Sequence, residues 1–82
     1  MVIVEFNPDF QKIFFRIKEI ALKERIIKQF EKIKENPEIG KPMRYTRKGT
    51  REVYVSPFRL SYSYIREEDK IIFIDLYHKD EQ

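Results

Sequence analysis

Apolar residues in the first half of the chain follow the spacing of one short strand and two helices. Apolar residues alternate over positions 2–6, which predicts a strand that stops at Asn7-Pro8-Asp9, where Asn7 or Asp9 can cap a helix. Two stripes with helical spacing follow: Phe10, Ile13, Phe14, Ile17 and Ile20 or Ala21, and then Leu22, Ile26, Phe30 and Ile33. We therefore predict a helical hairpin that bends near Glu19 to Lys23 and ends at Asn36-Pro37.

In the second half the apolar pattern changes to a period of two, which is typical of strands. The pattern predicts strands near residues 43–46, 51–55, 58–65 and 70–77. A turn at Ser56-Pro57 predicts the pairs Val55 with Phe58, Tyr54 with Arg59, Val53 with Leu60, Glu52 with Ser61 and Arg51 with Tyr62. A three-residue loop at 67–69 predicts the pairs Arg59 with Tyr77, Leu60 with Leu76, Ser61 with Asp75, Tyr62 with Ile74 and Tyr64 with Ile72.

These elements predict an α+β fold. We expect one domain, residues 1–82, in which the two helices pack on one face of a twisted, mostly antiparallel sheet of four strands, or five with a short extra strand, with the N-terminal strand inside it. Tyr62 and Tyr64 belong to the core side, together with Phe10, Phe14 and Phe30. The face away from the helices carries Glu52, Tyr54, Arg59, Ser61, Asp75 and Tyr77.

Composition excludes several classes of site. The chain has no cysteine and one histidine, which excludes disulfides and thiol ligands and argues against a closed metal site; we expect no metal and no cofactor. The longest apolar run, residues 71–74, is too short for a membrane span, and the N-terminal residues lack the basic segment of a signal peptide. We therefore expect a cytoplasmic protein.

Positive charge is concentrated in one segment. Six cations and one acid lie between Lys41 and Arg59, while the whole chain carries only +3. Cations interleaved with tyrosines suit a nucleic acid, because cations bind phosphates and rings stack on unpaired bases. The candidate RNA-binding residues are Lys41, Arg44, Arg47, Lys48, Arg51, Tyr54 and Tyr77, with Tyr45 as a further stacking candidate. The alternative is that a chain with 38% charged residues places cations on any solvated surface.

The order of these segments resembles the RelE/ParE superfamily of toxins from type II toxin–antitoxin modules. The resemblance rests on a helical hairpin ending in NPEIGKPM, a hairpin REVYVSPFRLSYSY and a last strand ending in LYHKD. Its most specific part is Phe58-Arg59-Leu60, with Tyr62 two residues later and Arg51-Glu52-Val53 before it. The resemblance implies a RelE-like microbial ribonuclease fold. RelE-like members cut mRNA in the ribosomal A site, ParE-like members poison DNA gyrase, and an antitoxin neutralises both.

The chemistry of RNA cleavage selects candidate catalytic residues. Cleavage through the RNA's own 2′-hydroxyl needs a base, a group that stabilises the pentavalent phosphate and an acid, but no metal. Arg59 is the candidate phosphate clamp, because its planar guanidinium can hold two phosphate oxygens. By resemblance, Glu52 corresponds to the carboxylate base of some members, His78 to an acid or base on the last strand, and Lys79 could assist His78. The terminal tyrosine of many members has no counterpart here.

Arg59, Glu52 and His78 could each have a role that involves no catalysis. Arg59 could form a surface ion pair with Glu52 or Asp75, Glu52 could be a solubilising edge charge, and His78 could be solvated. The leading hypothesis is a RelE-like, ribosome-dependent mRNA endoribonuclease in which Glu52, Arg59 and His78 converge on a basic face. The alternatives are a ParE-like gyrase inhibitor without nuclease activity and a catalytically degenerate antitoxin-binding or RNA-binding domain.

The resemblance and the charge pattern also imply partners. We expect the ribosome and mRNA as targets and an acidic cognate antitoxin, with which the chain could form a toxin–antitoxin heterotetramer. The antitoxin would cover exposed apolar ridges of the helices near Phe15 and Ile27.

Overall fold

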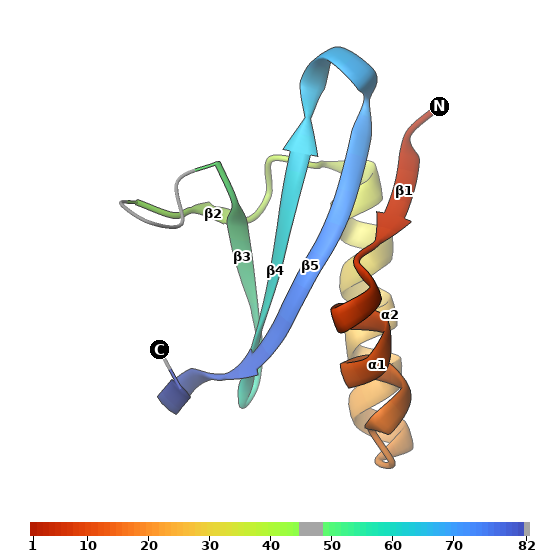
Figure 1. The fold of residues 1–82 in the computed structure, drawn as a ribbon, viewed down its shortest axis with the longest axis vertical. Coiled ribbons are helices and arrows are strands. Elements are labelled where there is room, and N and C mark those ends of the chain that lie inside the picture. Colours follow the sequence, from red (N-terminus) through yellow and green to blue (C-terminus); the bar gives the residue numbers. More distant parts are fainter. Residues whose placement is uncertain (45–48, 82) are drawn as a thin grey trace.

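A computed structural model describes residues 1–44 and 49–81 of the chain. The elements are β1 (Ile3–Phe6), α1 (Pro8–Arg16), α2 (Ile20–Glu35), β2 (Lys41–Pro42), β3 (Arg51–Val55), β4 (Phe58–Ile65), the 3-10 turn η2 (Arg66–Glu68), β5 (Lys70–His78) and the 3-10 turn η3 (Lys79–Glu81). The five strands form one sheet in the order β1-β5-β4-β3-β2, and the helical hairpin lies along one side of it (Figure 1). The predicted α+β class is confirmed, with five strands.

The N-terminal strand lies at an edge of the sheet, so the prediction that it lies inside the sheet is wrong. β1 pairs with β5 in parallel, while the other three pairings are antiparallel. Lys70 joins this edge to the turn before β5, because its ammonium lies 3.1 Å from a carboxylate oxygen of Glu5 and 3.2 Å from one of Glu68. Hydrogen bonds to these two carboxylates raise the pKa of Lys70.

The helices begin and end at local signals, with one correction to the predicted bend. The Asn7 side chain accepts a hydrogen bond from the Asp9 backbone N–H at 2.8 Å, which identifies Asn7 as the cap of α1. The break between the helices spans residues 17–19, earlier than the predicted Glu19 to Lys23. Ile17 leaves the helix with an extended backbone yet still packs on the core, so the apolar stripe gave no sign of the break.

Aromatic and aliphatic side chains fill the space between the helices and the sheet. The buried core residues are Phe10, Leu22, Ile26, Ile33, Val55, Leu60, Tyr62, Ile71, Phe73 and Leu76. Among the rings that the structure describes, the closest pair joins the two layers, because the centroid of Phe30 in α2 lies 4.5 Å from that of Phe73 in β5. The helices therefore cover the face of the sheet that the alternation predicted as apolar. Neither helix in the described ranges is long and apolar enough to cross a membrane.

The register of the first hairpin is confirmed, and that of the second is correct for only part of its length. All five predicted β3–β4 pairs occur, and so do Arg59 with Tyr77, Leu60 with Leu76 and Ser61 with Asp75. Beyond these, a bulge pairs Tyr62 with Phe73 and Tyr64 with Ile71, so the predicted pairs with Ile74 and Ile72 are wrong. The bulge turns Phe73 and Ile71 into the core, where both are fully buried.

The first strand after the helices is shorter and earlier than predicted. β2 covers only Lys41 and Pro42, which pair with Glu52 and Arg51, and the described Met43 and Arg44 lie outside it. Tyr45 and Thr46, the second half of the predicted strand, lie outside the described residues.

The loop that precedes β2 is fixed to the core through Tyr62. The Tyr62 hydroxyl accepts a hydrogen bond from the Gly40 N–H at 2.9 Å and donates one to the Pro37 carbonyl at 2.8 Å. A Cβ atom on Gly40 would lie 2.7 Å from this hydroxyl, so a larger residue there would force a shift. Burial raises the pKa of Tyr62. Tyr62 therefore links the loop to the fully buried centre of the sheet.

Removing the Tyr62 hydroxyl should destabilise the fold. Tyr62→Phe leaves the Gly40 N–H and the Pro37 carbonyl without this partner, which should lower the free energy of unfolding by about 1–3 kcal/mol. Tyr54→Phe is the matched control. Because the Tyr54 side chain is 49% exposed, removing its hydroxyl should change the free energy of unfolding by no more than about 0.5 kcal/mol. Thermal unfolding of both variants measures the difference, and equal melting temperatures would contradict the proposed role of the hydroxyl.

Candidate functional site

The sheet face opposite the helices carries two rows of polar and aromatic side chains. The first row crosses four strands through Lys41, Glu52, Ser61 and Asp75, and the second crosses three through Tyr54, Arg59 and Tyr77. We call these seven residues the open face. Side chains on adjacent positions of a strand point to opposite faces, so the rows alternate with the core residues of β3, β4 and β5. The six residues that the sequence predicted for this face, which are all of these except Lys41, therefore lie on it.

Arg59 lies at the centre of the second row. Its cross-strand neighbours are Tyr54 and Tyr77, and its guanidinium carbon lies 5.6 Å from the centre of the Tyr54 ring. Its Nε is buried and makes no hydrogen bond to any residue in the described ranges. No ion pair joins Arg59 to Glu52 or Asp75, so the simple surface ion pair is absent between these described residues. The half-buried guanidinium can therefore accept an anionic ligand from the solvent side.

Glu52 is not the exposed edge charge that the sequence allowed. Its side chain is only 4% exposed, and it accepts a hydrogen bond from the Tyr77 hydroxyl. Tyr77, on β5, reaches across β4 to make this contact, and Ser61 on β4 is 4% exposed. Glu52 and Tyr77 thus form a brace across three strands of the open face.

His78 and Lys79 do not join this group. His78 pairs with Phe58 and its ring lies edge-on to that ring at 5.7 Å, so alternation places it on the helix side of the sheet. Its Nδ1 accepts a hydrogen bond from the Asp80 N–H at 3.2 Å. Lys79 is exposed in η3, and its backbone N–H donates to the Pro57 carbonyl at 3.0 Å. Of the three residues that were expected to converge on one face, Glu52 and Arg59 lie there, and the prediction is wrong for His78.

The candidate RNA-binding cations are divided among different places. Lys41 is exposed on the open face and Arg44 is exposed just beyond β2, whereas Arg47 and Lys48 lie outside the described residues. Arg51 lies on the other side of the sheet, where its guanidinium donates to the Gly40 carbonyl at 2.8 Å and pairs with Glu38 at 3.6 Å. Arg51 thus holds the loop before β2, and its guanidinium does not face the site.

Asp75, on the open face, received no role from the sequence other than that of an ion-pair partner for Arg59. Asp75 is partly exposed, and its Oδ1 accepts a hydrogen bond from the Leu76 N–H at 2.8 Å. The signal for Asp75 was its place two residues before Tyr77 on an alternating strand. In the described part of the chain, no three His, Cys, Asp or Glu side chains are grouped so that they could hold a metal ion.

Comparison with known families explains the arrangement of the elements. The family model of the ParE toxin of type II toxin–antitoxin systems matches residues 4–82. The chain belongs to this toxin family. The resemblance read from the LYHKD and REVYVSPFRLSYSY segments is therefore confirmed at the level of the RelE/ParE superfamily. No curated protein has a matching sequence.

Solved structures of related toxins share the fold of this toxin. The RelBE2 toxin–antitoxin complex of Mycobacterium tuberculosis matches with a TM-score of 0.82 at 19% identity, covering 95% of this chain and 98% of that one. The YoeB/ParE toxin of Agrobacterium tumefaciens gives 0.84 at 12% identity, covering 94% and 98%. The RelE–RelB complex of Pyrococcus horikoshii gives 0.79 at 14% identity, covering 99% and 98%. At these identities the likeness is one of fold.

If the open face of the toxin binds RNA, Arg59 should contribute more to the affinity than an exposed cation elsewhere on the chain. Arg59→Ala should weaken binding of a single-stranded RNA by about 10- to 100-fold, because a charge-assisted hydrogen bond contributes about 1.5–3 kcal/mol. Arg59→Lys should lose less, since the charge remains and only the planar fork is lost. Arg16→Ala, which removes an exposed cation of α1, is the control. Fluorescence anisotropy with labelled RNA would contradict the site if Arg59→Ala and Arg16→Ala had equal affinities.

Proposed function

We propose that this toxin is a RelE-like endoribonuclease that cuts mRNA on the ribosome and so inhibits translation. The observation that supports the proposal is the position of Arg59, half-buried between two tyrosines on a sheet face that the helices leave open. A guanidinium in such a place can stabilise the charge that develops on a phosphate during cleavage. Tyr54, which is 49% exposed beside it, offers a ring on which a base can stack.

The proposed reaction needs no metal. The 2′-oxygen of the RNA attacks the neighbouring phosphate, Arg59 stabilises the pentavalent phosphate, and the 5′-oxygen leaves. The exposed ammonium of Lys41 and the exposed guanidinium of Arg44 would bind flanking phosphates. Because the contacts come from an open sheet surface, we propose that the ribosome presents the mRNA to it.

A second candidate function is supported by other observations. Glu52 is buried against Tyr77, and His78 and Lys79 do not lie on the open face, so three of the four proposed catalytic residues are not presented to a ligand there. A ParE-like toxin that inhibits DNA gyrase would need no such residues, and the matching family model carries the ParE name. Both candidates inhibit growth but differ in the molecule that is damaged.

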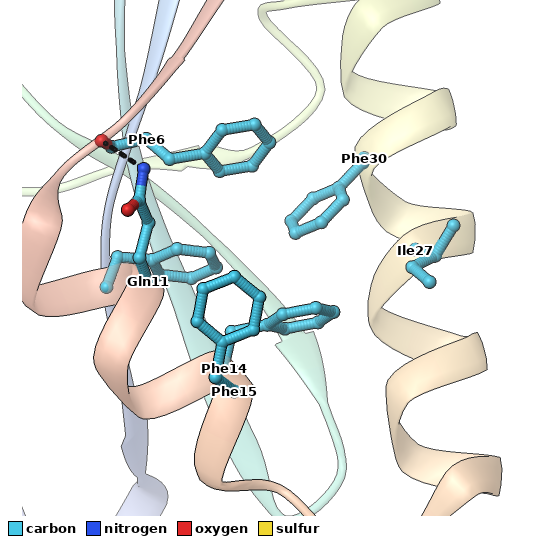
Figure 2. Close-up of a pocket in the computed structure, with 7 residues that line it drawn as sticks. Phe6, Gln11, Phe14, Phe15, Ile27 and Phe30 are labelled. Atoms are coloured by element: carbon cyan, nitrogen blue, oxygen red, sulfur yellow. Dashed lines mark hydrogen bonds between the residues drawn. The ribbon is translucent and has the colours of Figure 1, made fainter.

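We also propose that an antitoxin covers a groove on the helical side of the toxin. Figure 2 shows the groove, of about 310 Å³, between β1, α1 and α2. It is lined by Phe6, Phe10, Gln11, Phe14, Phe15, Ile27 and Phe30. Phe15 is 73% exposed and Ile27 46%, which is the ridge expected to bind an antitoxin. The Mycobacterium tuberculosis and Pyrococcus horikoshii structures are toxin–antitoxin complexes, and we propose a similar assembly here, as a heterotetramer.

Induction of the toxin without its antitoxin distinguishes the two candidate functions. We expect translation to stop and mRNA to be cut within coding regions, and Arg59→Ala should slow cleavage by about 10²-fold or more, because one transition-state contact to phosphate is lost. Arg16→Ala should cut normally. Intact mRNA together with gyrase-linked DNA breaks would exclude the nuclease and support the second candidate.

The groove can be tested with two isoleucines of similar exposure. Ile27 in the groove is 46% exposed and Ile39, in the loop before β2, is 48% exposed. Ile27→Gln should weaken binding of the antitoxin encoded by the neighbouring reading frame by about 10- to 100-fold, because burying such a side chain contributes about 1.5–3 kcal/mol. Ile39→Gln should leave the affinity unchanged. If the two variants bound the antitoxin with equal affinity in calorimetric titration, the antitoxin would bind outside the groove.

A further inference from the structure

The open face carries two carboxylates that differ in their access to a ligand. Glu52 is 4% exposed and accepts a hydrogen bond from the Tyr77 hydroxyl, so its carboxylate is committed to the brace across the sheet. Asp75 is partly exposed, and its Oδ1 is fixed by the Leu76 N–H at 2.8 Å. A carboxylate with one oxygen held by the backbone keeps its orientation while the other oxygen can meet a substrate.

Asp75 is placed within reach of a nucleotide bound at Arg59. Tyr77 is the direct cross-strand partner of Arg59, and Asp75 comes two residues before Tyr77 on the same face of β5. Diagonal neighbours of this kind have Cα atoms about 7–8 Å apart, a spacing that long side chains can bridge, so a phosphate bound at Arg59 would bring its ribose towards Asp75. Within the described part of the chain, Asp75 and Arg59 form no ion pair with each other.

We propose that Asp75 is the general base of the cleavage reaction, an inference that rests on the proposed endoribonuclease function. Asp75 Oδ2 takes the proton of the 2′-hydroxyl as the 2′-oxygen forms a bond to phosphorus. The bond between phosphorus and the 5′-oxygen breaks, and the 5′-oxygen takes a proton from water. The proton on Asp75 then passes to the hydroxide left by that water. The products are a 2′,3′-cyclic phosphate and a 5′-hydroxyl.

Glu52 takes a different part in this arrangement. Its bond to Tyr77 holds the Tyr77 ring beside Arg59, so Glu52 is a positioning residue that acts through Tyr77. His78 lies beside Phe58 on the helix side of the sheet and does not compete with Asp75 for the 2′-hydroxyl. The carboxylate that the family resemblance selected and the carboxylate that can reach RNA are therefore different residues.

Single-turnover cleavage on ribosomes programmed with a defined mRNA tests this assignment. Asp75→Asn should slow cleavage by about 10²-fold or more, because the amide cannot accept the proton. Its side-chain oxygen can still accept the Leu76 N–H, so thermal unfolding should match that of the wild type. Affinity for a 2′-O-methyl RNA, which cannot be cut, should be retained. Glu67→Gln is the control, because it removes an exposed carboxylate in η2, the turn between β4 and β5. This variant should cut mRNA at the wild-type rate.

The possible outcomes distinguish a failure of the Asp75 assignment from a failure of the proposed nuclease function. If wild type and Asp75→Asn cut equally fast, the toxin is a nuclease but Asp75 is not its base. The same conclusion follows if Glu52→Gln slows cleavage by about 10²-fold and Asp75→Asn does not, because Glu52 would then be the base. If the wild-type toxin leaves mRNA intact on the ribosome, the nuclease function fails and the assignment of Asp75 is overturned with it.

Discussion

The alternation of side chains along three adjacent strands, interrupted by one bulge in β5, is the constraint on which the rest of this toxin depends. In β3, β4 and β5 every second side chain faces the helices and builds the core, and the residues between them build the open face. A shift of one residue in either hairpin would bury the Arg59 guanidinium without a partner or expose Leu76. The same register therefore stabilises the fold and presents the site.

The bulge in β5 shows how far the sequence determines this register. The turn at Ser56-Pro57 and the polar residues beside it were sufficient to predict every pair of the first hairpin. In the second hairpin, residues 71–74 are all apolar, so binary patterning could not decide which of them face the core. Packing against Phe30 decided it, because Phe73 fills the space beneath the helices and Ile74 is left on the bulge.

The positions of the candidate site residues on the sheet were predictable where alternation was applied, and were wrong where residue type was used instead. Arg59 and its two tyrosine neighbours were placed correctly. His78 follows Tyr77 directly, so the register that put Tyr77 beside Arg59 already put His78 on the opposite face. The burial of Glu52 was beyond the sequence, because it depends on the Tyr77 side chain crossing β4, a contact between distant segments that no local pattern records.

The parallel pairing of β1 with β5 has a consequence for the synthesis of the toxin. β1 lies at the edge of the sheet with β5 as its neighbour, and both helices and the three other strands lie between them in the sequence. The sheet can therefore close only late in translation, because contacts between such distant segments form after the intervening chain has emerged. Arg59 likewise lacks Tyr77 until β5 is in place. A nascent toxin thus carries no assembled open face until β5 has been added to the sheet.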